Sequence, residues 1–217
     1  MRITLLRLLG WAVVLGLTAP AAHGQFIVRV AGELSGRHNS GLVASDRFDG
    51  AFDTEPGFSV GAAFAPEMPL SALRSAVQVG IGVEHQFGRG VQDVEGDFRF
   101  TTPHALARLR YDARVSPFVS GRGGFSLFAG DDAYTASEYE GLGPSFREGA
   151  TVQLRGFVAY SLGGGVFFGD RFFLEVLWNH YEGSRITRRP VEGDVDAFTT
   201  YRTVSLGAGY RLGKTRL

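Results

Sequence analysis

The chain has 217 residues, of which 22 are basic and 22 acidic, and this even balance argues against a nucleic-acid-binding protein, which carries an excess of positive charge. Its 31 glycines disfavour a helical bundle, because glycine destabilises the interior of a helix. The sequence has no cysteine, which excludes disulfides, thiolate zinc sites and cysteine nucleophiles.

The N-terminal segment follows the pattern of a secretory signal peptide, residues 1–24. Arg2 and Arg7 supply positive charge around the start of a short apolar segment, and a small-x-small cleavage pattern ends at Gly24. The apolar segment is shorter than the roughly 20 residues of a spanning helix, so a signal peptide is favoured over an N-terminal membrane anchor. We therefore expect an exported chain, residues 25–217, that forms one domain because no linker divides it.

Apolar and polar side chains alternate with period two along most of this domain, which is the pattern of strands with two unlike faces. The pattern predicts eight strands, at residues 25–37, 57–65, 76–87, 98–111, 118–128, 152–168, 172–180 and 198–212. In the fourth, the apolar face starts with Phe98 and Phe100 and then changes parity near Pro103. Because proline cannot donate to a ladder, we expect a β-bulge there.

The connections between the predicted strands alternate between short and long. Three short ones are residues 66–75, 112–117 and 169–171, and four long polar ones are residues 38–55, 88–97, 129–150 and 182–197. Such a succession of hairpins describes an antiparallel up-and-down meander. Eight strands of this kind can close on themselves, so the predicted fold is an all-β, eight-stranded barrel.

The choice between a membrane barrel and a soluble barrel depends on which face points outward. The less apolar face is rich in Gly, Ala and Ser, as at Gly61, Ser126 and Gly207, which suits a crowded interior better than a surface in water. Aromatic residues of the apolar face gather at the strand ends, as expected of girdles at two membrane interfaces. These residues are Phe26, Phe64, Tyr111, Phe168, Phe172 and Tyr210 near the short turns, and Phe58, Phe87, Phe98, Trp178 and Phe198 near the long loops. The pattern favours a transmembrane barrel over a soluble, lipocalin-like carrier.

Charged side chains on the inner face predict an ion-pair network inside the barrel, because buried charges persist only when they are paired. The residues expected in it are Arg29, Glu33, Glu84, Arg108, Arg122, Arg155 and Glu175. Two further arginines, Arg99 and Arg211, are expected at the rims. Positive charge is in excess, so water or an anion is expected to complete the network, and the side chains leave no open pore.

At this point the chain resembles the small eight-stranded outer-membrane barrels, the group of the OmpA transmembrane domain, OmpX and Opa-like proteins. The last strand matches the C-terminal assembly signal of such barrels at Ser205, Gly207, Tyr210 and Leu212. The resemblance implies a Gram-negative outer membrane with both termini in the periplasm and the long loops outside. It also implies contact with outer-membrane lipid, lipopolysaccharide and the outer-membrane assembly machinery.

One segment suggests enzymatic chemistry, the run from Trp178 to Ser184. Outer-membrane lipid A deacylases place a histidine and a serine two residues apart on the lipid face of a late strand. Here His180 has the outward parity, Glu182 is two residues later, and Ser184 follows. A histidine beside a hydroxyl and a carboxylate can form a triad, so a lipid-modifying hydrolase is the alternative to a girdle role for this histidine.

The loops carry charges that suggest binding without defining a site. Acidic groups, among them Asp46, Asp49 and Asp53, lack the spacing of a calcium loop. A basic group, Arg185, Arg188 and Arg189, is suited to phosphates of lipopolysaccharide. We expect no cofactor or metal, and a non-enzymatic role in envelope structure or in binding an extracellular ligand through the four long loops.

Overall fold

The computed structural model describes residues 25–34, 36–42, 50–70, 73–91, 94–130, 151–189 and 193–213. The side chains of residues 38–53, 91, 94–96, 130, 151–157, 184–189 and 193–199 are not part of that description. The predicted signal peptide, residues 1–24, therefore lies outside the described residues. The described part of the chain contains no helix that is long and apolar enough to cross a membrane.

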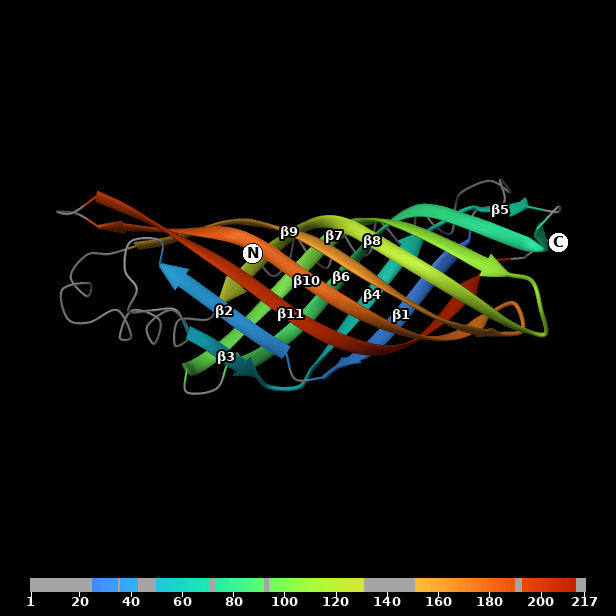
Figure 1. Cartoon of the computed structure of the whole chain (residues 1–217), viewed down its shortest axis with the longest axis horizontal. Helices are drawn as coiled ribbons and strands as arrows, with labels where there is room; N and C mark the ends of the chain where they lie inside the picture. The colour runs from blue at the N-terminus through green and yellow to red at the C-terminus, as the bar shows by residue number, and fades with distance from the viewer. Residues whose placement is uncertain are drawn as a thin grey trace.

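The described residues form antiparallel strands that close into an eight-stranded barrel, which confirms the predicted fold (Figure 1). The strands are β1 (Phe26–Glu33), β2 (Gly36–Leu42), β3 (Gly50–Thr54), β4 (Gly57–Phe64), β5 (Glu67–Leu70), β6 (Ser75–Val91), β7 (Val94–Tyr111), β8 (Val115–Gly130), β9 (Thr151–Phe168), β10 (Phe172–Arg189) and β11 (Gly193–Leu212). Of these, β2 continues the wall of β1, and β3 and β5 continue the wall of β4.

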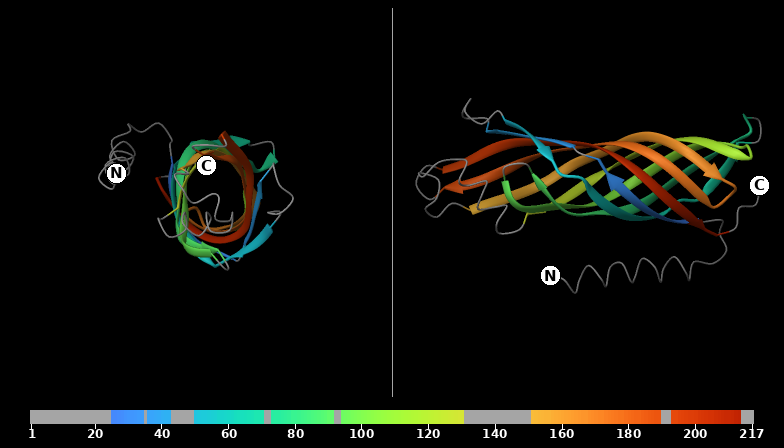
Figure 2. Two further views of the ribbon diagram at one scale, coloured as in Figure 1. Left: turned by 90° about the vertical axis from the view of Figure 1, so that its left-hand side faces the viewer. Right: turned by 90° about the horizontal axis from the view of Figure 1, so that it is seen from below.

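Pairing between the first and last strands closes the wall. β1 pairs with β4 on one side and with β11 on the other, with Phe26 opposite both Phe64 and Leu212. The wall then runs through β6, β7, β8, β9 and β10 back to β11. Figure 2 shows the resulting ring end-on. A closed ring leaves no unpaired sheet edge along the joined strands, as a membrane-spanning sheet requires.

Three of the four segments predicted as long loops are largely strand, which corrects the expected boundaries. β2 and β3 pair within residues 38–55, β6 and β7 extend into residues 88–97, and β10 pairs with β11 as far as Arg189 and Gly193. The reason is that the hydrogen bonds between strands join backbone groups and need no apolar side chains. A strand can therefore continue into a polar hairpin beyond the point where the apolar alternation stops. The fourth segment, residues 129–150, lies mostly outside the described residues.

The bulge expected near Pro103 is instead in β6. Pairing of β7 with β6 and β8 keeps one register on both sides of Pro103, whereas the β6–β7 register shifts between Gln86 and Arg89. Even-numbered β7 side chains from Phe98 to Arg110 are therefore all buried. Phe98 and Phe100 point into the barrel, where they pack with other rings, and the assignment of Phe98 to an outer girdle is wrong.

The apolar face points outward, as the membrane-barrel interpretation requires. Val79, Ile81, Leu162 and Leu206 are between 47% and 71% exposed, whereas Arg108 is 2% exposed. The outward apolar residues of β11 run from Val204 to Leu212, which matches the roughly 9–11 residues of a tilted transmembrane strand. A continuous exposed belt of this kind is a surface for hydrocarbon rather than for water.

Candidate functional site

The centre of the barrel holds a carboxylate that joins its own strand to three others across the lumen. Glu175, on β10, accepts hydrogen bonds from Arg29 Nε and Arg122 Nη2, both at 2.5 Å, and from Arg108 Nη2 at 3.1 Å. These arginines project from β1, β8 and β7. Since Glu175 is fully buried, its charge is compensated entirely by these guanidinium groups.

A second carboxylate completes the central cluster. Glu84, on β6, accepts hydrogen bonds from Arg29 Nη1 and Arg122 Nη1, each at 2.7 Å, and from the hydroxyl of Ser59 at 2.9 Å. Arg29 and Arg122 thus each bridge Glu84 and Glu175. Charge-assisted bonds of this geometry are the strongest polar contacts in a protein, and together they tie opposite walls of the barrel.

The long-hairpin half of the lumen is filled by an ion pair and a stack of aromatic rings. Arg89 Nη2 lies 3.3 Å from Glu33 Oε2, and both side chains are buried. The neighbouring rings form an aromatic cluster that includes Phe98, Phe100, Phe128, Tyr181 and Tyr201, with Phe100 stacked 4.6 Å from Tyr181.

A further group of charges fills the short-turn end. Glu67, on β5, accepts bonds from Arg211 Nη1 and Gln25 Nε2, both at 2.8 Å, and lies 2.8 Å from Arg110 Nη2. Arg211 is fully buried, so its expected place at a solvated rim is wrong. The reason is that β5 continues the wall with Glu67 opposite the inward Gln78, so the Glu67 carboxylate projects into the lumen and neutralises the guanidinium there.

The structure brings together six of the seven residues expected in the internal network. The central cluster consists of Arg29, Glu84, Arg108, Arg122 and Glu175. Glu33 pairs with Arg89 in the long-hairpin half of the lumen. The side chain of Arg155, on β9, is outside the described residues. Two further partners in the lumen, Arg89 and Glu67, were not predicted, because each lies in a segment expected to be a connection.

The described lumen is packed rather than open. Arg108 is held over the rings of Phe118 and Phe173, with its guanidinium carbon 4.3 and 4.6 Å from the two ring centres. Two small cavities border the cluster, both lined by Glu84, His104 and Arg122, and each measures about 20 Å³, which is room for about one water molecule. A side-chain column therefore blocks the axis along the described residues.

Residues expected in the assembly signal have structural roles within β11. Ser205 points inward and accepts a 2.9 Å bond from Arg29 Nη2, and a Cβ on Gly207 would lie 2.9 Å from Arg29 Nε. Tyr210 and Leu212 point outward in the apolar belt. Packing around the guanidinium of Arg29 thus accounts for a small residue at position 207.

On the outer surface, His180 bridges two charged side chains just beyond the belt. Its Nδ1 accepts a 3.2 Å bond from Arg202 Nε, and its Nε2 lies 3.3 Å from Glu182 Oε2. The ring is 4% exposed beside the rings of Tyr160 and Trp178. Because Nδ1 is an acceptor here, the ring proton is on Nε2, and both ring nitrogens are occupied.

The side chains of the charged loop groups, the aspartates beginning at Asp46 and the arginines Arg185, Arg188 and Arg189, are outside the described residues. Within the described part of the chain, no group of His, Asp and Glu side chains could hold a metal ion.

No protein-family model and no curated protein sequence matches this chain. Among solved structures it is similar to the outer membrane protein OprG from Pseudomonas aeruginosa, with 13% identity, a TM-score of 0.47 and coverage of 88% of this chain and 97% of that one. Neisserial surface protein A has 11% identity, a TM-score of 0.45 and coverage of 85% and 96%. The outer membrane enzyme PagL has 11% identity, a TM-score of 0.45 and coverage of 85% and 99%.

Proposed function

We propose that this chain is an integral outer-membrane barrel of a Gram-negative bacterium, without enzymatic activity, that serves envelope structure or surface interaction through its long hairpins. It would belong with the small barrels typified by the OmpA transmembrane domain, OmpX and Opa-like proteins. The observation that carries the proposal is an exposed apolar belt around an interior filled by paired charges.

The packed interior supports a role other than solute passage. A hydrated ion moving along the axis would have to displace Glu175 and its three guanidinium partners, all of which are held by several bonds. We therefore expect purified protein in planar lipid bilayers to show no stable ion conductance. Steady single-channel openings would contradict this part of the proposal.

The unequal ends of the barrel support a role for the hairpins in binding. Short turns and β5 lie at one end, and the extended β2–β3 and β10–β11 pairs lie at the other (Figure 1). In the proposed orientation the long end faces outside, where it would meet lipopolysaccharide and extracellular ligands. The short end would face the periplasm, and Tyr210 and Leu212 would be read there by the assembly machinery.

Location and folding are tested together. We expect the protein in outer-membrane fractions, with an electrophoretic mobility that differs between boiled and unboiled samples because the closed barrel survives detergent. A mature protein that stays soluble without detergent would refute the proposal and favour the soluble carrier.

A lipid-modifying hydrolase centred on His180 is the second candidate. The contact with Glu182 favours it, since an acid can orient a catalytic histidine. The bond from Arg202 to Nδ1 argues against it, because a general base needs a free nitrogen beside its nucleophile. Incubation with lipid A decides: loss of acyl chains with wild-type protein but not with His180→Ala would establish the hydrolase.

A further inference from the structure

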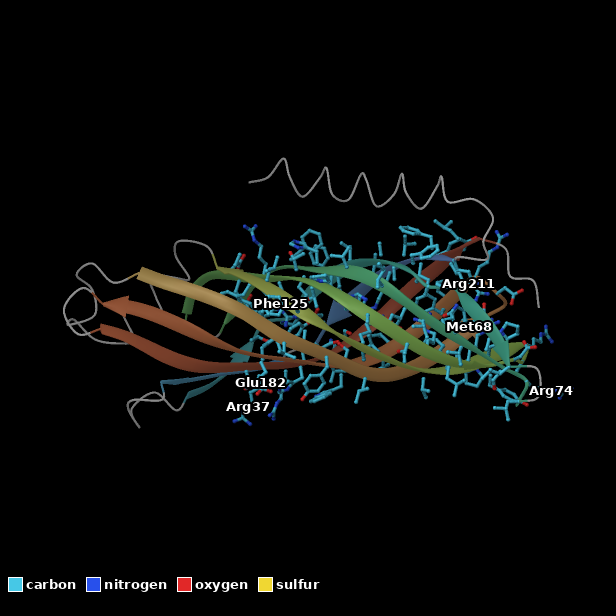
Figure 3. All side chains as sticks on the ribbon, turned by 90° about the horizontal axis from the view of Figure 1, so that it is seen from above. Arg37, Met68, Arg74, Phe125, Glu182 and Arg211 are labelled. Atoms are coloured by element: carbon cyan, nitrogen blue, oxygen red, sulfur yellow. The ribbon has the colours of Figure 1, made fainter. Side chains whose placement is uncertain are left out.

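Two exposed arginines face each other on the outer surface, immediately beyond the apolar belt. Arg202 on β11 is the direct cross-strand partner of Arg37 on β2, so the two side chains leave the barrel on the same face. Both are exposed, and Figure 3 shows Arg37 on the same side of the barrel as Glu182. Two residues nearer the short turns on β11, Val204 belongs to the belt.

The local contacts fix Arg202, whereas Arg37 has a second cross-strand partner, Asp53 on β3, besides Arg202. Arg202 is held through Nε by His180, which is itself held by Glu182. Within the described part of the chain, Arg37 forms no ion pair. Like charges that are directly opposed on neighbouring strands destabilise a sheet, so an anion that binds both guanidinium groups would relieve their repulsion.

Aromatic rings lie on the membrane side of this pair. Trp178 lies two residues before His180 on β10. Its ring is in edge contact with the ring of Tyr160, and the two ring centres are 5.7 Å apart. Both rings are 38% exposed, so they present a surface to a molecule lying along the barrel. Such rings occupy the interface between hydrocarbon and headgroups, which sets the arginines at headgroup depth.

We propose that Arg37 and Arg202 bind the phosphate of a phosphorylated glycolipid in the outer leaflet, with its sugar beside Trp178 and its acyl chains along the belt. A guanidinium presents paired hydrogen-bond donors that match the oxygens of a phosphate, and two guanidinium groups can bind the same phosphate from opposite sides. The inference rests on the proposed membrane location and names a lipid partner for one face of the barrel.

Tryptophan fluorescence tests the site directly, because the two tryptophans of the sequence are Trp11 and Trp178, and only Trp178 remains in a chain processed after Gly24. Folded, delipidated protein in maltoside micelles is titrated with diphosphorylated lipid A. We expect a saturable change in fluorescence, weakened about tenfold or more by Arg37→Gln or Arg202→Gln, as for the loss of a charge-assisted hydrogen-bonding group.

Two further variants separate charge from geometry. Arg99→Gln removes the same charge from an exposed, outward arginine on β7 and leaves the affinity unchanged. Arg37→Lys keeps the charge but loses the planar fork, so its affinity falls between those of wild type and Arg37→Gln.

Four outcomes overturn the inference. One is an equal loss of affinity in Arg202→Gln and Arg99→Gln. Another is equally tight binding of lipid A that lacks phosphate. Competition by inorganic phosphate at the same concentration would indicate a site for a soluble anion, and equal binding of phosphatidylglycerol would indicate a general anionic surface. If the protein keeps its heat-dependent mobility but fails these tests, only the lipid site is refuted. If the wild-type protein is absent from the outer-membrane fraction, the proposed function is refuted.

Discussion

Replacing Glu175 by Gln removes the charge that balances the centre of the lumen. Arg29 and Arg122 keep their bonds to Glu84, but Arg108 loses its carboxylate partner and retains a 3.4 Å contact with Gln78. A buried charge without its partner is costly, and breaking a buried ion pair costs about 3–5 kcal/mol. Glu84→Gln leaves all three arginines in contact with Glu175, so we expect it to cost less.

The assay is urea unfolding of the purified barrel in micelles. The quantity measured at each urea concentration is the fraction of protein that still migrates as the folded form on an unboiled gel. With a urea dependence of about 2 kcal/mol per molar, the expected loss moves the midpoint of Glu175→Gln down by roughly 2 M. Glu55→Gln is the matched control, because Glu55 is exposed, and we expect its midpoint to change little. Adding Arg108→Met to Glu175→Gln removes the stranded charge and restores part of the stability.

The reasoning is refuted if Glu175→Gln unfolds within about 1 kcal/mol of Glu55→Gln, a difference typical of exposed sites. That result would mean that water solvates Arg108 inside the barrel and that the ion pairs contribute little to stability. A double variant less stable than Glu175→Gln would also contradict it, since the Arg108 side chain would then stabilise the barrel through its packing on aromatic rings.

The remaining predictions concern the wall, the aromatic cluster and the belt. Gly124→Ala would press a Cβ against the backbone oxygen of Pro103 and place it 2.8 Å from His104 Cα, so it should lower the urea midpoint, whereas Gly123→Ala, with no atom within 4 Å, should not. Phe100→Ala should cost about 3–5 kcal/mol in the same assay, and Phe125→Ala, which is exposed, clearly less; equal losses would contradict the packing described for the lumen. Leu162→Arg on the belt should cost about 2–4 kcal/mol in lipid vesicles if it lies near the bilayer centre, and a neutral effect would argue against burial in hydrocarbon.

Strand number, order and facing could be predicted because they follow from local alternation. In residues 57–65, for example, one face carries Ser59, Gly61 and Ala63 and the other carries Phe58 and Phe64. This contrast distinguishes the inner from the outer face without knowledge of the adjacent strands. Hydropathy does not identify a strand where it extends past the apolar belt, so the polar hairpins beyond the belt were predicted as loops. Their continuation depends on backbone pairing, which leaves no trace in side-chain character.

The interior was predictable in kind but not in detail. Arg29 and Glu175 are 146 positions apart, and alternation shows only that both point inward, not that they meet. Phe98 and Phe100 are apolar yet inward, because the lumen is aromatic near the long hairpins and not polar throughout. Arg89 was not predicted because it lies beyond residue 87, where the expected strand ended, and the register shift after Gln86 turns its side chain inward.

Glu175 draws its arginines from the first strand as well as from the middle of the chain, and this has a consequence for assembly. Arg29 can reach Glu84 through the β1–β4–β6 sheet, but it lies far from Glu175 until β1 pairs with β11. A sheet that is still open would also expose its unpaired edges. Pairing of the terminal strands and formation of the Arg29–Glu175 contact are thus a single event. Closure therefore supplies Arg29 with its second carboxylate, which favours the closed barrel over a partly paired sheet.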